Sequence, residues 1–331
     1  MSAPRAAGQH LPYAEVPAAV RAWVDDTLGS PVVRTAEQTG GMSPGCVTRL
    51  VCADGTRAFV KAVGADLNPD SPALHRREAL ALGLLGPHPL WADLLASYDD
   101  GAWVALLLED VEGHHPDLSD DRQMAALLEA TDELGAVMRS RVPDPPRPPA
   151  GEGPPLYRRG LTDLRAVFEG WQAGLDHVAG LPSDLAPRWL VERVDDLRPG
   201  VAALTTVATD VLVHWDIRND NLLVRPSGDV VFLDWGACGI GPDWLDPLLA
   251  RLERVHLPWF DESLSTSPAL ARAGDELVTS TLVALGTFLA HRAHTAVDVN
   301  LPTLAAFRRR ESARFLDAAA RRLGVGHGLG S

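Results

Sequence analysis

The chain has few cysteines and no long apolar run, and both shortages narrow its class. Only three cysteines, Cys46, Cys52 and Cys238, occur among 331 residues, and no pair has C-x-x-C spacing. A disulfide framework or a zinc site is therefore not expected, and a reducing compartment is the default. Residues 1–15 lack the apolar segment of a signal peptide, and no apolar stretch of about 18 residues occurs, so we expect a cytoplasmic protein without a membrane span.

Positive charge is also scarce. The chain has 30 Lys and Arg against 44 Asp and Glu, a formal net charge of -14. Proteins that bind nucleic acid or anionic membranes usually present basic surface, so we expect neither partner. The sequence also lacks Gly-x-x-x-x-Gly-Lys-Ser/Thr, Gly-x-Ser-x-Gly and His-Glu-x-x-His, which removes several enzyme classes. Its hydrophobic fraction of 46% is typical of a globular protein, and its length allows two lobes.

Residues 211–236 carry the most informative pattern. Two apolar, β-branched runs flank a polar loop and a Pro-Ser-Gly-Asp turn, which predicts a hairpin centred near Ser227. In that hairpin the numbers of facing residues sum to about 454, so Asn221 faces Leu233 and lies beside Asp234. Asp216 precedes them on the loop. Two carboxylates and an amide that converge at a strand end form a hard oxygen site suited to Mg²⁺.

The first 110 residues predict a mostly antiparallel sheet with one helix between its strands. Ser71 is expected to cap that helix, with Pro72 in its first turn and Glu78 in its middle. The turn at 53–56 predicts a hairpin whose facing residues sum to about 109, which pairs Lys61 with Thr48. The expected elements are a helix at 16–28, strands at 32–38, 46–52 and 57–63, the helix from 71, and strands at 94–98 and 103–108.

From residue 110 the pattern becomes helical. Ser119 is expected to cap a helix with an apolar stripe that runs to Met138. Further helices are predicted near 161–175, 187–197, 244–255, 275–293 and 304–323.

The spacing His214-x-Asp216-x-x-x-x-Asn221, followed by Asp234-x-Gly236, resembles the catalytic and magnesium-binding segments of the aminoglycoside phosphotransferase family, which is related to choline kinase and to protein kinases. Trp215 stands where that family usually has glycine. The resemblance implies an α+β, two-lobed protein kinase-like fold with a small antiparallel-sheet N-lobe and a larger, mainly helical C-lobe. The expected division is 1–30 as an N-terminal helical extension, 31–109 as the nucleotide-binding N-lobe, and 110–331 as the catalytic and substrate-binding C-lobe.

The resemblance also implies the chemical roles of the motif residues. Asp216 would accept the proton of the attacking hydroxyl, while Asn221 and Asp234 would hold Mg²⁺ against the ATP phosphates. Lys61 would neutralise the α- and β-phosphates, and Glu78 would fix Lys61 by an ion pair.

Further positions would surround the nucleotide or support the loop. The backbone of Gly40, Gly41 and Gly45 would lie over the phosphates, where glycine permits close approach. Glu109 and Val111 belong to the hinge that would meet the adenine. His214 and Asp246 are expected to buttress the catalytic loop, and Arg218 is expected to form a salt bridge within that loop, with a contact to the γ-phosphate as the alternative.

The expected activity is transfer of the ATP γ-phosphate to a hydroxyl of a small molecule. Only eleven residues separate Asp234 from Asp246, too few for the peptide platform of a protein kinase. An aminoglycoside or another antibiotic is one class of acceptor, which would make the protein a resistance enzyme. A sugar, an amino alcohol or homoserine is another, and a nucleotide-binding regulator without turnover is the alternative from a different class. The sequence leaves the oligomeric state open.

Overall fold

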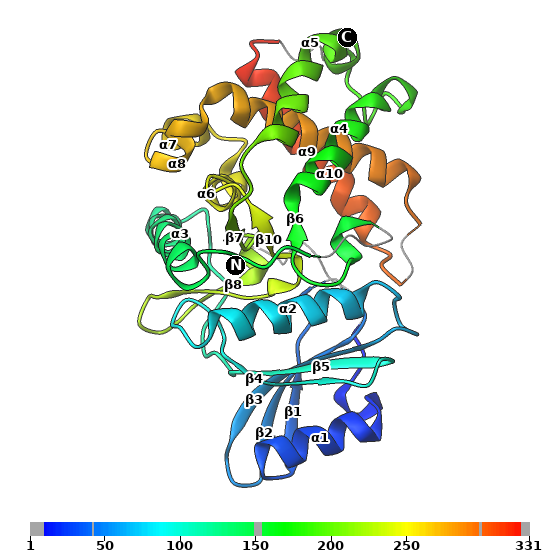
Figure 1. The fold of residues 1–331 in the computed structure, drawn as a ribbon, viewed down its shortest axis with the longest axis vertical. Helices are drawn as coiled ribbons and strands as arrows, with labels where there is room; N and C mark the ends of the chain where they lie inside the picture. The colour runs from blue at the N-terminus through cyan, green and yellow to red at the C-terminus, as the bar shows by residue number, and fades with distance from the viewer. Residues whose placement is uncertain (1–9, 42, 149–153, 298–299, 326–331) are drawn as a thin grey trace.

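The computed structural model describes residues 10–41, 43–148, 154–297 and 300–325 as a smaller and a larger lobe (Figure 1). In the smaller lobe, five antiparallel strands form a sheet in the order β1-β2-β3-β5-β4. A larger, mainly helical lobe follows the last strand of this sheet. The strands are β1 (Val32–Glu37), β2 (Cys46–Cys52), β3 (Arg57–Gly64), β4 (Leu94–Asp99) and β5 (Trp103–Leu108).

Two helices cover opposite faces of the sheet. Helix α1 (Ala18–Leu28) lies on the outer face, and α2 (Ser71–Leu85) lies between the sheet and the larger lobe (Figure 1). Because successive residues of a strand point to opposite faces, Val60 packs toward α1 while Lys61 lies on the inner face with Leu106. The inner face therefore presents Lys61 to the side of the sheet on which α2 and the larger lobe lie.

The hairpin of β2 and β3 differs by one residue from the predicted pairing. Lys61 pairs with Val47, not with Thr48. The cause is a three-residue loop that ends in Gly55, whose φ of 92° is left-handed, whereas the prediction assumed an even-numbered turn. Thr48 instead points to the outer face, where it is buried.

The N-termini of two helices also differ from the prediction. The side chain of Asn68, not Ser71, accepts the first free N–H groups of α2, those of Asp70 and Ser71. Asp120, not Ser119, caps the next helix. In both places another short polar side chain near the predicted cap accepts the free N–H groups.

The larger lobe has eight α-helices and two small sheets among its described residues. The predicted helix at 244–255 ends already at Arg251, and α7 and α8 were not predicted. The helices are α3 (Asp121–Arg141), α4 (Leu164–Asp176), α5 (Arg188–Ala203), α6 (Leu245–Arg251), α7 (Trp259–Leu264), α8 (Pro268–Ala273), α9 (Asp275–Thr295) and α10 (Leu304–Arg322). The strands are β6 (Thr162–Asp163), β7 (Val211–Val213), β8 (Leu222–Val224), β9 (Val230–Phe232) and β10 (Gly239–Gly241).

The β8–β9 hairpin has the predicted register, with Leu222 opposite Phe232. The pairing continues one residue further, because the Leu233 N–H donates to the Asn221 carbonyl (2.8 Å). This brings Asn221, at the end of the loop 214–221 (called the catalytic loop below), next to Asp234, as the sequence predicted.

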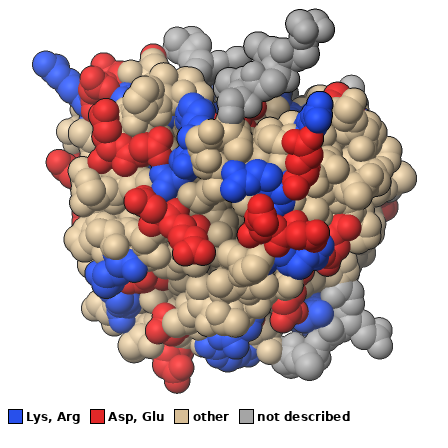
Figure 2. Space-filling model, turned by 90° about the horizontal axis from the view of Figure 1, so that it is seen from above, with Lys and Arg blue, Asp and Glu red and all other residues tan. Residues whose placement is uncertain are grey.

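Two general features bear on possible partners. Acidic and basic side chains are interspersed on the face drawn in Figure 2. Of the helices in the described part of the chain, none combines the length and the hydropathy that a bilayer span requires.

Candidate active site

Lys61 lies between carboxylates from both lobes. Its Nζ donates to Oε2 of Glu78 on α2 (2.6 Å) and to Oδ1 of Asp234 (2.8 Å). The predicted ion pair between Lys61 and Glu78 is therefore present. The Lys61 side chain is 11% exposed and that of Glu78 is 2% exposed, so water screens this pair little.

The charges of this group stabilise one another. Desolvation alone would lower the pKa of Lys61, but the carboxylates of Asp234 and Glu78 outweigh it and hold this pKa above its ordinary value. Desolvation would likewise raise the pKa of Asp234, but the Lys61 ammonium holds it well below the usual range. At neutral pH the site therefore holds a charged lysine and an ionised Asp234.

The loop that carries Asp234 approaches α2 very closely. Asp234 itself is left-handed, with φ of 62°, and the 3-10 turn Trp235–Ala237 follows. A Cβ at Gly236 would lie 3.2 Å from the Cβ of Leu74, so only glycine fits there without displacement. The Trp235 N–H points to Oε1 of Glu78 at 3.4 Å, which gives the Glu78 carboxylate a second partner from the larger lobe.

Asp246 holds the start of the catalytic loop. Its carboxylate accepts the backbone N–H groups of His214 (2.7 Å) and Trp215 (2.9 Å). His214 donates from Nε2 to the Leu233 carbonyl (2.9 Å), which ties the loop to the Asp234 segment. Both residues thus have the buttressing contacts that the sequence predicted.

Trp215 adopts a backbone conformation that usually requires glycine. Its φ is 72°, a region that costs a non-glycine residue about 1–3 kcal/mol. The bond to Asp246 and the stacking of its ring on Trp171 of α4, with centroids 5.3 Å apart, hold it there. The φ value explains why glycine is the usual residue at this position.

Asp216 follows directly, and neighbours from its own loop hold its carboxylate. Asn221 donates from Nδ2 to Oδ2 of Asp216 and to its carbonyl, both at 2.9 Å. Arg218 lies 3.2 Å from Oδ1 of Asp216 and 3.3 Å from Oδ2 of Asp220, the predicted salt bridge within the loop. Burial raises the pKa of Asp216 to about 6, although Arg218 opposes this rise.

The donor set fits a magnesium ion carried by a nucleotide. The Nδ2 of Asn221 faces Asp216, which leaves its Oδ1 to face a cation, and Asp234 uses only one of its two carboxylate oxygens for Lys61. In the described residues no three His, Cys, Asp or Glu side chains form a metal cluster. Mg²⁺ bound through phosphates needs only one or two carboxylates from the protein, so Asn221 and Asp234 are suitable ligands.

The glycine turn, with Gly40, Gly41 and Gly45, connects β1 to β2. Gly41 is left-handed, with φ of 93°. A Cβ at Gly45 would lie 2.3 Å from the Ala62 carbonyl oxygen, so glycine is required where the turn meets β3. Gly40 precedes Gly41 in the connection, but the structure does not describe Met42 between Gly41 and Gly45.

The hinge is already hydrogen-bonded internally. The Val111 N–H donates to the Glu109 carbonyl (3.1 Å), and the Val111 carbonyl accepts from Nη2 of Arg49 (3.1 Å). An adenine ring that uses the Val111 N–H as a donor must replace its hydrogen bond to Glu109.

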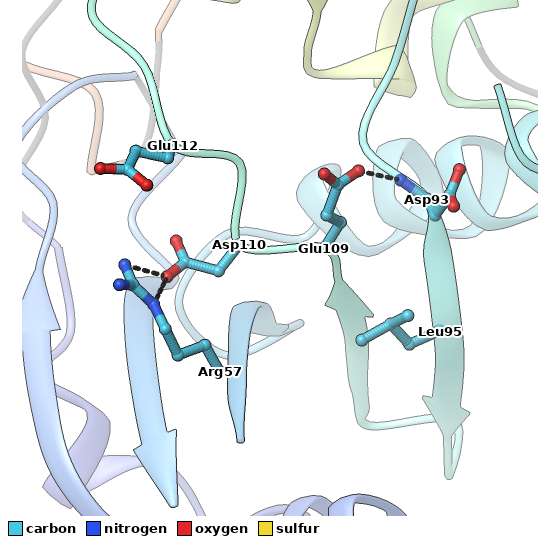
Figure 3. A pocket seen from close by; sticks show the side chains of 6 residues that line it. All are labelled: Arg57, Asp93, Leu95, Glu109, Asp110 and Glu112. Atoms are coloured by element: carbon cyan, nitrogen blue, oxygen red, sulfur yellow. Dashed lines mark hydrogen bonds and ion pairs between the residues drawn. The ribbon is translucent and has the colours of Figure 1, made fainter. Parts of the chain in front are cut away.

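A hollow of about 340 Å³ lies beside the hinge and carries the wrong charge for phosphate. Asp110 in it pairs with Arg57, and a Glu109 carboxylate oxygen faces the Asp93 N–H (Figure 3). Four carboxylates and one arginine line it together with Leu95, namely Asp93, Glu109, Asp110, Glu112 and Arg57. The carboxylates of this hollow would repel phosphate groups.

Two features of the site were not recognised from the sequence. The first is that Lys61 is the only lysine of the chain, whereas arginine occurs throughout it. An ammonium is a compact point charge, and here it lies between two carboxylates. The other feature is the set of bonds made by Arg77. Its partners are all backbone carbonyls, so no pattern of residue types in the sequence points to them.

The comparison with known families decides the class of the protein. The model of the phosphotransferase enzyme family (APH) matches residues 68–251, more than half of the chain. This chain belongs to that family. The resemblance seen in the sequence and the predicted enzyme class, a small-molecule phosphotransferase, are thereby confirmed. No curated protein matches this phosphotransferase in sequence.

Solved structures confirm the two-lobed, kinase-like fold. Aminoglycoside phosphotransferase APH(4)-Ia is similar with a TM-score of 0.61 at 13% identity, covering 93% of this chain and 99% of that one. Choline kinase LicA from Streptococcus pneumoniae has a TM-score of 0.54 at 15% identity, covering 91% and 98%. Amicoumacin kinase hAmiN has a TM-score of 0.50 at 15% identity, covering 85% and 88%.

Proposed function

We propose that this phosphotransferase moves the γ-phosphate of ATP to a hydroxyl of a small molecule. The observation that carries the proposal is the pairing of Lys61 with both Glu78 and Asp234, while Asn221 holds Asp216 a few residues away. Phosphoryl transfer needs positioned charges more than covalent chemistry, and this group supplies them. The smaller lobe (31–109) binds the nucleotide, residues 1–30 extend it with a helix, and the larger lobe (110–331) binds the acceptor.

Asp216 is the proposed base of the reaction. Its pKa of about 6 leaves it ionised at neutral pH yet able to accept a proton. Asn221 orients it through the bond at 2.9 Å, so that one face of the carboxylate meets the attacking hydroxyl. Lys61 neutralises the phosphates that remain on the nucleotide.

Asn221 and Asp234 are the proposed ligands of Mg²⁺. The ion supplies charge neutralisation on the β- and γ-phosphate oxygens. Related structures support a nucleotide and a divalent cation here, because hAmiN was crystallised with AMP-PNP and Ca²⁺ and APH(4)-Ia with ADP and hygromycin B. Gly40, Gly41 and Gly45 would cover the phosphates, and the backbone of Glu109 and Val111 would meet the base.

The acceptor is proposed only as a class. Aminoglycosides, amicoumacin and choline appear in the names of the structural neighbours, so an antibiotic and an amino alcohol both remain candidates for this chain. A sugar or homoserine belongs to the same chemical class. The regulator without turnover has no observation in its favour, because the proposed base and both metal ligands are in place.

Substitution of Asp216 by alanine tests the assignment. We expect Asp216→Ala to abolish magnesium-dependent ADP release in a screen of hydroxyl-bearing antibiotics and metabolites, while AMP-PNP still binds. Asp243→Ala, which removes a half-buried carboxylate paired with Arg272, serves as the matched control and should keep full turnover. Unchanged turnover of Asp216→Ala would refute the role of Asp216.

A further inference from the structure

Arg77 is a fully buried arginine of α2 that binds only to the larger lobe. Its side chain precedes Glu78, the partner of Lys61, and the residue is 1% exposed. Its guanidinium donates to four backbone carbonyls, those of Gly236 (3.0 Å), Gly160 (3.1 Å), Leu156 (2.5 Å) and Arg158 (3.2 Å). Gly236 belongs to the Asp234 loop, and the other three precede α4.

This arrangement fixes the direction of the side chain. A guanidinium has five N–H donors in a rigid plane, and here Nε, Nη1 and Nη2 all reach carbonyls on separate segments. Among the described residues, no carboxylate lies within ion-pair distance of Arg77. The buried charge is therefore balanced by aligned carbonyl dipoles, and it is stable only while both segments hold their places around α2.

The preceding residue makes the opposite connection. Arg76 binds the Asp99 carboxylate at 2.7 and 2.8 Å and also reaches the Gly101 carbonyl, all within the smaller lobe, and its side chain is 40% exposed. Two successive arginines thus tie α2 to the sheet on one side and to the larger lobe on the other.

We propose that Arg77 is a positioning residue that locks α2 onto the larger lobe and thereby holds Glu78 in register with Lys61. Glu78 meets Lys61 through Oε2 and the Trp235 N–H through Oε1, and both contacts require a fixed rotation of α2. Arg77 sets that rotation from one residue away. The inference rests on the proposed function, because it matters only if Lys61 binds a nucleotide.

The variants Arg77→Met, Arg77→Lys and Arg76→Met test this role. In calorimetric titrations with AMP-PNP and Mg²⁺, we expect Arg77→Met to raise the dissociation constant about tenfold or more, since the lost donors release α2. Arg77→Lys has one donor nitrogen in place of three and should raise the dissociation constant by a smaller factor. Arg76→Met, the control, should stay within about twofold because its bonds do not reach the larger lobe.

The single lysine gives a second, spectroscopic readout. Protein labelled with [¹³C]lysine has one lysine side-chain signal, that of Lys61. This signal should shift in Arg77→Met and stay in place in Arg76→Met. Thermal unfolding checks that each variant is folded; if Arg77→Met does not fold, the AMP-PNP titration of Arg77→Lys decides.

A double-mutant cycle separates positioning from general support. If Arg77 acts through Glu78, then Arg77→Met should change the dissociation constant less than about twofold in a Glu78→Gln background. Additive losses, or an unshifted lysine signal with unchanged affinity, would overturn the inference while the wild-type protein still binds AMP-PNP. A wild-type protein that binds no AMP-PNP would overturn the proposed function itself, and the inference with it.

Discussion

The two sides of the active site differ in how fully their polar groups are bonded. On the nucleotide side, Lys61 bridges two carboxylates at 2.6 and 2.8 Å, and Glu78 uses both of its oxygens. On the catalytic loop, Arg218 meets Asp216 and Asp220 only at 3.2 and 3.3 Å, and both buried oxygens of Asp220 lack a hydrogen bond. Lys61 and Glu78 on the first side are bonded before a ligand arrives, whereas Asp220 on the second has bonding capacity left.

This difference indicates where binding energy would act. A completed ion-pair network needs no reorganisation when the nucleotide enters, so it favours preorganised charge stabilisation. A loop with spare donors and acceptors can rearrange when acceptor and γ-phosphate arrive together. Loss of a group should therefore impair nucleotide binding on the first side and turnover alone on the second.

The largest effect is expected from Lys61→Met. It leaves the Glu78 and Asp234 carboxylates close together without their cation and removes the charge that faces the phosphates. Turnover should fall by about 10²- to 10³-fold, together with nucleotide affinity. ADP release and AMP-PNP titration measure the two losses; a variant that keeps its affinity would contradict the contrast between the two sides.

Asp246→Ala should cause the largest loss of stability on the catalytic loop. The backbone N–H groups of His214 and Trp215 would lose their acceptor in a buried place. We expect the free energy of unfolding in urea to fall by about 2–4 kcal/mol. A loss as small as that of Glu192→Gln, which breaks an exposed pair with Arg188, would show that Asp246 does not hold the loop.

A pH dependence of stability should arise on the nucleotide side. Burial lowers the pKa of His75 to about 3, while the unfolded chain has its ordinary value near 6.5. The unfolded state alone takes up this proton as the pH falls below 6.5, so the free energy of unfolding declines toward acid by about 1–2 kcal/mol between pH 7 and pH 5.

His75→Gln should flatten this decline in urea titrations at both pH values. His214, whose pKa burial also lowers, should retain its own part of the decline. An unchanged slope would mean that His75 is protonated in the folded protein.

The smallest effect is expected from Arg218→Met. It removes the cation between Asp216 and Asp220, so turnover should fall about tenfold while the AMP-PNP dissociation constant stays within about twofold. Arg218→Lys keeps a charge and should recover part of the rate. If affinity fell as much as turnover, the catalytic loop would belong to the nucleotide side after all.

Much of the fold could be predicted because its signals are local. The β8–β9 hairpin had a turn sequence and two apolar runs, and its register was correct. The β2–β3 register was wrong by one because Gly55 adds a left-handed residue that the turn composition did not specify. Asn68 and Asp120 took over the predicted caps because only the local chain path decides which side chain reaches the free N–H groups.

The site was predicted in part for the same reason. The spacing of Asp216 and Asn221 and the hairpin register suffice to bring them near Asp234, and an ion pair such as that of Lys61 and Glu78 carries a charge signal. Arg77 could not be found, because it binds backbone carbonyls from two distant segments and any residue type can supply those. Its role emerges only when α2 meets the larger lobe in three dimensions.

The single lysine has a practical consequence for chemical labelling. Reagents that acylate amines find one side-chain target in this chain, the ammonium that lies between Glu78 and Asp234. Under the proposed function, a nucleotide that carries a reactive acyl phosphate would modify Lys61, and excess ATP would protect it.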